Sequence, residues 1–524
     1  MMGAKRMLTF LLFCIVGTQI LALPSEDQIK QFENWYKTQN PWFSKDSVVD
    51  IENLKYKADL QNEKGDFWWL EDEETTIDDT ETEFVDIDWS TWDRDRITLG
   101  ATSELQSRPG VYATKPIKKG DIILTIPKSL IVAFSDLLLH DFVGDLAHKL
   151  WMYYSLGTMF DPGYYEAIHL WVLFEKFYAQ NHPESASEPR NSWDVGFWKL
   201  WLDTLPEPSD MNNILFFKFA ELRELIGSPL HKRATDRRNE MKDHFDWLMD
   251  NVIRAYPRVF KDEPSEEQYK WSVSITRSTN FQVKIPERKD AYSLQPAIVP
   301  FLDKFRHVPS GHQNVKYFYD IEDKQFIVQA VADVNPGEEL TVSWGPKCNS
   351  ELLDFHGFIL DNNPDDCVHV NLELNSGDPM YNSKNVLLKA EKLDPADYKL
   401  VRGGLTSELL LATRIMTLDP SDWRLDFVFG GFPRASLGTH ADLAVADFLL
   451  KQCRKQYTAY PTSIDEDDEA MNEEGISPRK RLAILVRKGE KDILRTMGSF
   501  YFEELKRLAD VLKEEIDEGL HDEL

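Results

Sequence analysis

The chain has 524 residues, with 89 acidic against 60 basic side chains and a formal net charge of −29 at pH 7. This length exceeds what one hydrophobic core usually supports, so at least two domains are expected. The charge excludes a nucleic-acid-binding role, because contacts to phosphates need clustered Lys and Arg.

The N-terminus has the pattern of a secretory signal peptide. Lys5 and Arg6 precede the apolar run 7–16, and Ala22 offers a cleavage point. The apolar core of about 10 residues falls short of the ~20 that a membrane-spanning helix needs. We therefore predict that residues 1–22 are removed and that the mature chain enters the secretory pathway without membrane insertion.

Residues 23–94 are predicted to form a short helix followed by an acidic linker. The stretch from Ser25 to Gln28 has the pattern of a capping box, which opens a helix through Trp35. Residues 71–88 hold ten carboxylates, which repel one another and favour a flexible linker. Weak calcium binding is the functional alternative, although this run lacks the glycine and the ligand spacing of an EF-hand loop.

Strand patterns begin at Gly110. The runs Val111–Ala113 and Ile122–Ile126 flank a turn at Lys119–Asp121. Two such runs around a glycine turn predict a β-hairpin.

A helical insertion is predicted inside the β-rich domain. Residues from about 133 to 265 carry large apolar side chains at three- and four-residue spacing, which is typical of helices. Strand patterns return at Tyr317–Ala330, so the β-rich domain extends over residues 95–375. Residues 376–516 are predicted to form a second, all-helical domain.

The last eight residues, 517–524, form a tail that ends in His521-Asp522-Glu523-Leu524. This tetrapeptide is an endoplasmic-reticulum (ER) retrieval signal, although an acidic, solvated helix end would look similar. Because the N-terminal signal agrees with it, we predict that the protein resides in the ER lumen. The retrieval receptor is then one expected partner, and a membrane is not.

Cysteine and histidine spacing bounds the covalent and metal chemistry. Cys14 leaves with the signal peptide, so at most one intramolecular disulfide can form, and its pairing stays open among Cys348, Cys367 and Cys453. The absence of a Cys-x-x-Cys pair argues against a zinc site or a thioredoxin-like oxidoreductase. The spacing of His140, His148 and His169 does not match that of metal ligands, so no metal site is predicted there.

An ordered set of motifs carries a family resemblance. The set comprises Arg108–Ala113, Ile126–Pro127, Leu205–Pro206, Leu222–Leu230, Trp271, Arg277–Phe281, Gly337–Leu340 and Asn363–Asp366. It resembles the SET domain of the Rubisco large-subunit lysine and actin-histidine methyltransferase family. In the C-terminal part, Leu409–Met416 and Arg487–Leu494 are similar to the family's helical substrate-binding domain. The resemblance implies an α+β fold, in which a β-rich SET domain with a helical insertion precedes an all-helical domain.

The resemblance also implies a reaction and its residues. S-adenosylmethionine would be the cofactor, and an in-line transfer would place its methyl group on a lysine or histidine nitrogen of a protein. By resemblance, the expected cofactor-binding residues are Arg108, Gly110, Arg277, Arg306 and His307. The expected catalytic residues are Trp344 and His356, which stand where the family places active-site tyrosines.

Several of these positions depart from the family pattern. Arg306 replaces an asparagine and brings a cation toward the cofactor's sulfonium; at ~4 Å and an effective dielectric of ~20, two such charges repel by roughly 4 kcal/mol. Pro109 removes an N–H near the expected cofactor loop. Trp344 lacks the tyrosine hydroxyl, and loss of one positioned donor costs about 10²–10³ in rate. His356 can compensate in part, because an imidazole accepts a proton or orients a nitrogen acceptor.

Two functions therefore remain open. The departures favour a degenerate site that leaves the protein a binding scaffold for a protein or peptide client in the ER lumen. The alternative is an active S-adenosylmethionine-dependent N-methyltransferase that acts on a lumenal lysine or histidine. A third class, an acidic calcium buffer, fits only the charge.

Overall fold

The computed structural model describes residues 97–103, 106–156, 164–179, 194–288, 291–321, 323–393, 397–424, 427 and 431–522, with Asp27, Lys30, Gln31 and Asn34 nearer the N-terminus. These four residues are helical, in the stretch where the capped helix is predicted. The predicted signal peptide, the acidic linker and the last two residues of the retrieval signal lie outside the described residues. The chain divides into two compact units, Met1–Met211 with Lys242–Trp344 and Asn212–Met241 with Gly345–Leu524.

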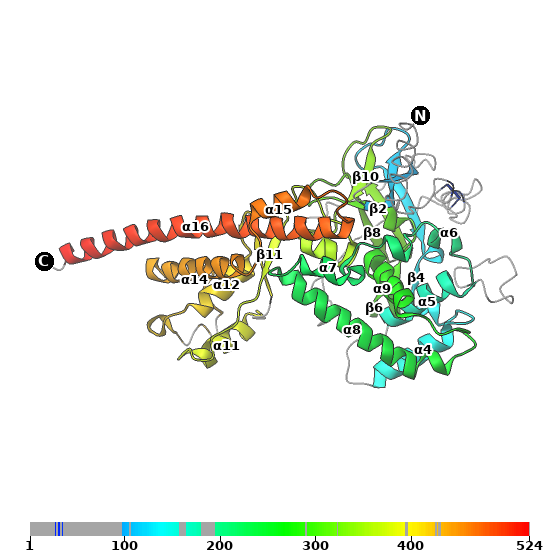
Figure 1. Ribbon diagram of the computed structural model, residues 1–524, viewed down its shortest axis with the longest axis horizontal. Helices are drawn as coiled ribbons and strands as arrows, with labels where there is room; N and C mark the ends of the chain where they lie inside the picture. The colour runs from blue at the N-terminus through cyan, green and yellow to red at the C-terminus, as the bar shows by residue number, and fades with distance from the viewer. Residues whose placement is uncertain are drawn as a thin grey trace, which may run out of the picture. The chain divides into compact units, whose positions relative to one another are not determined.

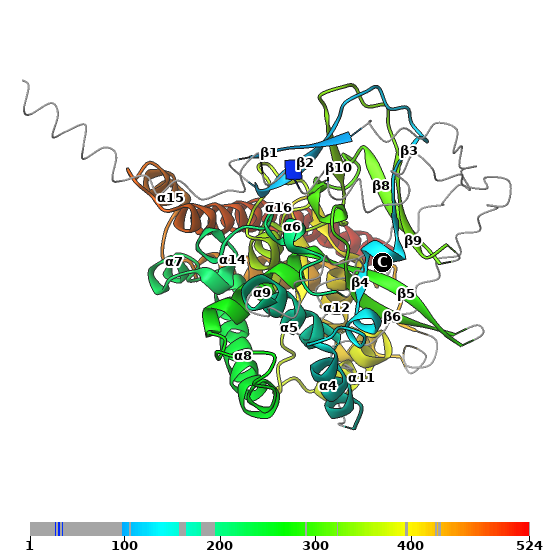
Figure 2. The same ribbon diagram turned by 90° about the vertical axis from the view of Figure 1, so that its right-hand side faces the viewer.

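The first unit is built on three small sheets (Figures 1 and 2). Their strand orders are β1-β2-β10-β7, β3-β9-β8 and β4-β6-β5. The strands are β1 (Ile97–Ser103), β2 (Gln106–Ala113), β3 (Ile122–Pro127), β4 (Val132–Ala133), β5 (Asn280–Arg288), β6 (Ala291–Ile298), β7 (Arg306–His307), β8 (Val315–Asp320), β9 (Gln325–Ala330) and β10 (Glu339–Val342).

The predicted hairpin is wrong in its pairing. Both strands form, and Gly120 supplies the turn with a φ of 94°. However, β2 pairs with β1 and β10, whereas β3 pairs with β9. A backbone bridge between Ile117 and Val334 anchors the connecting segment, and the two strands therefore enter different sheets.

Helices fill the chain between β4 and β5, which confirms the helical insertion. The helices of this stretch that lie wholly in the first unit are α3 (Phe134–Leu137), α4 (Gly144–Leu156), α5 (Tyr164–Phe177), α6 (Lys199–Leu202) and α9 (Glu266–Thr279). The insertion thus ends at Thr279, beyond the predicted end near 265. Trp171 on α5 is buried and stacks on Trp201 of α6, with ring centroids 6.4 Å apart. Trp171 and Trp201 therefore form core, whereas Trp151 and Tyr153 on α4 are exposed.

Helices dominate the second unit. They are α7 (Phe219–Arg223), the start of α8 (Pro229–Asn251), α10 (Asn349–Glu351), a π-helix (Leu352–His356), α11 (Tyr381–Ala390), α12 (Ser407–Met416), α14 (Thr439–Tyr457), α15 (Ile464–Met471) and α16 (Pro478–Asp522). In Figure 1, α14 runs beside α16, and their buried side chains belong to one hydrophobic core.

A small sheet, β11-β12-β13, corrects the prediction of an all-helical C-terminal domain. Its strands are β11 (Cys367–Val370), β12 (Tyr398–Val401) and β13 (Gly404–Leu405). On β12, the buried side chains of Tyr398 and Leu400 alternate with half-exposed neighbours. Four residues are too few for this alternation to be distinguished in a sequence.

The compact units divide the chain after Trp344, and the domain boundary near residue 375 stays a prediction. Residues 345–366 join the second unit, where Asp366 accepts hydrogen bonds from the backbone N–H groups of Asn349 and Cys367. Within the described part of the chain, no helix combines the length and the apolar character that crossing a bilayer requires.

Candidate functional site

One sheet of the first unit brings four predicted site residues together. Gly110 lies on β2, Arg306 and His307 form β7, and Trp344 follows the end of β10. β10 lies between the other two strands, because it pairs with β2 through Leu340 and runs parallel to β7. Gly110 precedes Arg306 by 196 residues and Trp344 by 234, and only sheet pairing makes these residues neighbours.

Asn314 fixes the central strand of this site. Its side-chain nitrogen donates to the carbonyl of Glu339 at 2.8 Å, and its side-chain oxygen accepts from the backbone N–H of Thr341 at 2.7 Å. An amide that satisfies one donor and one acceptor of the same strand holds that strand in register. Sequence reasoning missed Asn314, because nothing nearby in the chain indicates which strand it would contact.

Arg306 forms an ion pair with Glu339 on the neighbouring strand. Its Nε lies 3.1 Å from Oε1, and its Nη1 donates to Oε2 at 3.3 Å. The two side chains are 11% and 24% exposed, so the pair is largely shielded from water. Only the contact from Nη1 to Oε2 is a hydrogen bond, and the approach of Nε to Oε1 adds a charge contact without hydrogen-bond geometry.

This ion pair lies directly against Gly110. A Cβ atom at Gly110 would stand 2.3 Å from Oε1 of Glu339 and 3.0 Å from Nη2 of Arg306. A side chain at residue 110 would therefore have to push aside the ends of two side chains of the same protein. The space over Gly110, where the resemblance expects the cofactor, is taken by Arg306 and Glu339.

The pairing corrects the electrostatic argument drawn from Arg306 alone. The guanidinium has an anionic neighbour, so the repulsion of roughly 4 kcal/mol computed for an isolated cation is partly cancelled. Burial raises the pKa of the Glu339 carboxyl, and the Arg306 guanidinium opposes that rise. Glu339 belongs to the Gly337–Leu340 motif, but the sequence did not indicate that it pairs with Arg306.

His307 and Trp344 form an aromatic stack beside the pair. Their ring centroids are 4.8 Å apart with an interplanar angle of 8°. The backbone N–H of Trp344 donates to Nδ1 of His307 at 3.1 Å, which puts the remaining proton of a neutral imidazole on Nε2. The flat indole of Trp344 therefore packs against His307. It lacks the hydroxyl that a tyrosine at this position would contribute.

The structure says less about the two other predicted cofactor-binding residues, Arg108 and Arg277. Arg108 lies on β2, but its side chain is outside the described part of the structure. Arg277 lies on α9. Burial lowers the pKa of His244 to about 4, and the positive charge of Arg277 lowers it further. Burial and then Arg277 also lower the pKa of His169. Arg277 is therefore close to the imidazoles of α5 and α8.

His356 belongs to the second unit, where it ends the π-helix. Gly357 follows with a φ of 76°, and a Cβ there would lie 2.7 Å from the backbone N of Asn213. Just before His356, Asp354 lies 3.2 Å from Nη1 of Arg237, and the Arg237 guanidinium stands 4.2 Å from the Phe355 ring centroid. A π-helical turn is a frequent feature of functional sites. Arg237 is a further residue that the sequence did not indicate.

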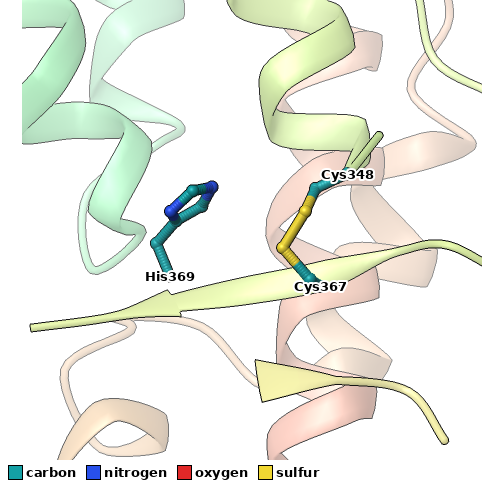
Figure 3. A group of neighbouring side chains, drawn as sticks. All are labelled: Cys348, Cys367 and His369. Carbon is teal, nitrogen blue, oxygen red and sulfur yellow. A yellow bond between two sulfur atoms is a disulfide. The ribbon is translucent and has the colours of Figure 1, made fainter. Parts of the chain in front are cut away.

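The second unit also settles the cysteine pairing that the sequence left open. Cys348 and Cys367 form a disulfide, and Cys453 is a buried free thiol. Figure 3 shows His369 on the same strand as Cys367, and one ring nitrogen lies within 4.8 Å of both sulfurs. The sulfurs are bonded to each other, and His369 Nδ1 lies 3.0 Å from both carboxylate oxygens of Asp397. In this state the cluster is a disulfide beside an ion-pair network.

Comparison with known families identifies both parts of the chain. Residues 109–345 match the SET domain, and residues 375–494 match the domain described as Rubisco LSMT substrate-binding. The chain is a SET-domain protein with a Rubisco LSMT substrate-binding domain.

Curated relatives of this SET-domain protein include actin-histidine N-methyltransferases. The one from Homo sapiens is 23% identical over 402 residues, which cover 74% of this chain and 62% of the relative. The one from Canis lupus familiaris is 24% identical and is covered over 63% of its length. The chain thus spans less than two thirds of these relatives.

Solved structures confirm the fold. Rubisco LSMT bound to AdoMet superimposes with a TM-score of 0.60 at 20% identity, covering 79% of this chain and 88% of that one. The SET domain of LSMT bound to lysine and AdoHcy gives a TM-score of 0.58 at 19% identity with the same coverage. The predicted α+β architecture is therefore confirmed.

Proposed function

We propose that this SET-domain protein resides in the ER lumen and binds a protein client, and that its cofactor position is closed by its own side chains. One observation carries the proposal: the Arg306–Glu339 ion pair lies where even a Cβ on Gly110 would be 2.3 Å from Glu339 Oε1. A cofactor bound against Gly110 would have to displace this pair. S-adenosylmethionine, the cofactor that the SET-domain match and the solved relatives support, would therefore meet a closed position in this arrangement.

The aromatic stack supports the same proposal. The family's active-site tyrosine hydroxyl is replaced at Trp344 by an indole, which lies flat on His307. An indole offers one N–H donor and no acceptor, so it cannot take a proton from an incoming nitrogen. Of the two predicted catalytic residues, only His356 has a group that can exchange a proton at neutral pH.

The compartment and the partners follow from other features. The N-terminal signal pattern and the terminal His521–Leu524 support residence in the ER lumen and contact with the retrieval receptor. The relatives are named for protein substrates, actin and Rubisco, and this chain carries a domain described as substrate-binding. A protein client is therefore the proposed ligand, and the net charge of −29 disfavours nucleic acid.

An active N-methyltransferase is the second candidate. Glu339 supports it, because a paired Arg306 is a weaker obstacle to a sulfonium than an isolated cation. In that case S-adenosylmethionine, which solved relatives bind, would be the cofactor, and a lumenal lysine or histidine the acceptor. The Arg306–Glu339 pair would have to move away from Gly110 before the cofactor binds.

Calorimetric titration of the purified protein with S-adenosylmethionine tests the proposal. We expect binding weaker than ~100 μM, equivalent to less than about 5.5 kcal/mol of binding free energy. Dissociation in the low micromolar range would overturn the closed-site proposal and favour the enzyme. S-adenosylhomocysteine, which lacks the sulfonium charge, is the matched ligand that separates steric closure from charge repulsion.

A further inference from the structure

The segment that carries His356 is closed on itself by the disulfide. Cys348 and Cys367 are separated by 19 residues, and between them lie α10, the π-helix and the turn at Gly357. His356 is therefore presented by a covalently closed loop. We call residues 349–366 the closed loop.

Hydrogen bonds tie the two ends of the closed loop together independently of the disulfide. The Asn349 side chain donates to the carbonyl of Leu360 at 3.1 Å and accepts from its N–H at 2.9 Å. Asn363 donates to the carbonyl of Lys347 at 2.8 Å, and Asp366 accepts from the Asn349 N–H at 2.9 Å. These contacts remain when the S–S bond is broken, so the loop keeps its fold but loses its covalent restraint.

The surroundings of the sulfurs suit a bond that can be opened and closed. His369 shares a face of β11 with Cys367, and its ring lies near the S–S bond in Figure 3. An imidazole nitrogen of His369 lies within 4.8 Å of both sulfurs, and Nε2 of this ring is 3.2 Å from Nη1 of Arg233, so positive charge near the sulfurs favours the thiolate that exchange requires. Glu351 connects the two sides, because it accepts from the Cys348 N–H at 2.9 Å and its Oε1 lies 3.5 Å from His369 Nε2.

We propose that Cys348–Cys367 is a redox-controlled clamp that fixes the closed loop and with it His356. A dithiol reductant reduces it: the S–S bond breaks, two protons and two electrons pass to Cys348 and Cys367, and the dithiol becomes a disulfide. Both cysteines are buried, so exchange requires local opening and is slow. The idea that His356 faces a client rests on the proposed function. The restraint of the closed loop by the disulfide does not depend on the proposed function.

Hydrogen exchange of the full chain tests the clamp. The oxidised protein is compared with protein reduced by dithiothreitol under native conditions, and peptide mass spectrometry after alkylation reports the state of each cysteine. In the reduced protein, the amides of residues 352–357 should exchange at least about tenfold faster, because the loop opens more often. The β8–β9 hairpin should not change, and reoxidation should restore the original rates.

Two variants remove the dependence on reductant. Cys348→Ser with Cys367→Ser should reproduce the reduced pattern, whereas the matched control Cys453→Ser should exchange like oxidised wild type. Reaction of His356 with diethyl pyrocarbonate should also accelerate in the double variant, which reports the side chain directly.

Three results would overturn the clamp. They are unchanged exchange at 352–357 after complete reduction, a disulfide that dithiothreitol does not reduce in the folded protein, and loss of protection throughout α14 and α16 on reduction. The last would show that the bond maintains the whole unit. None of these results depends on whether S-adenosylmethionine or a client binds, so the clamp and the proposed function fail separately.

Discussion

Replacing Arg306 with asparagine together with Glu339 with glutamine should strengthen S-adenosylmethionine binding by about twentyfold, because the pair repels the sulfonium far less than an isolated cation would. A guanidinium at ~4 Å from the sulfonium repels it by about 4 kcal/mol at an effective dielectric of ~20. Glu339 contacts the guanidinium at 3.1 and 3.3 Å. Its carboxylate, standing at ~7 Å from the sulfonium, attracts it by about 2.4 kcal/mol. The remainder of about 1.8 kcal/mol is the net repulsion of the pair, and it is the gain expected when both side chains lose their charge.

Glu339→Gln alone should weaken binding by about fiftyfold, because the guanidinium then loses its compensating charge. Glu338→Gln is the matched control: it removes the same charge from the adjacent residue, whose carboxylate is exposed and accepts from Asn335. That control should leave affinity unchanged. Competition calorimetry measures all three variants, and thermal unfolding checks that each is folded.

Two outcomes would refute this reasoning. If the double variant Arg306→Asn with Glu339→Gln folds normally and binds within twofold of wild type, the ion pair does not limit the cofactor. Pro109, which lies on β2 next to Gly110 and lacks a backbone N–H, would then be the next cause to examine. If the gain approaches a thousandfold, Glu339 does not compensate Arg306, and the pair is not maintained in solution.

The double variant Trp344→Tyr with His356→Tyr should leave cofactor affinity nearly unchanged. Adding Arg306→Asn to it should give methyl transfer to a lysine or histidine peptide. Methyl transfer by the Arg306→Asn single variant would contradict this prediction. Deleting His521–Leu524 should release the protein into the medium, as immunoblotting of medium and cells would report; a truncated form that stays cytosolic would refute the signal peptide. Burial raises the pKa of Glu490 from 4.5 to about 7. Between these two pKa values the folded state keeps a proton that the unfolded state has released, so stability falls as the pH rises through this range. Glu490→Gln should therefore stabilise the protein by roughly 3 kcal/mol at pH 8 and little at pH 4, measured by urea unfolding; equal effects at both pH values would disprove the assignment.

The elements themselves could be predicted because they depend on nearby residues. The strands at Val111–Ala113 and Ile122–Ile126 and the helical spacing of the insertion are local patterns of period 2 and 3.6. Pairing is not local, and the strands predicted as a hairpin joined β10 and β9 instead. The choice among partner strands rests on contacts such as Ile117 with Val334, which no short window of sequence contains.

The site shows the same division. The sequence alone determined that Arg306, Trp344 and His356 depart from the family pattern, because residue identity is read directly. The tertiary structure decided what those residues do. A charge is compensated only by a group within a few ångströms, and Glu339 comes within 3.1 Å of Arg306 through the register of β10 against β7. Likewise, three cysteines permit three pairings, and the approach of Cys348 to Cys367 selected one, since a disulfide forms only where the fold brings two Cβ atoms together.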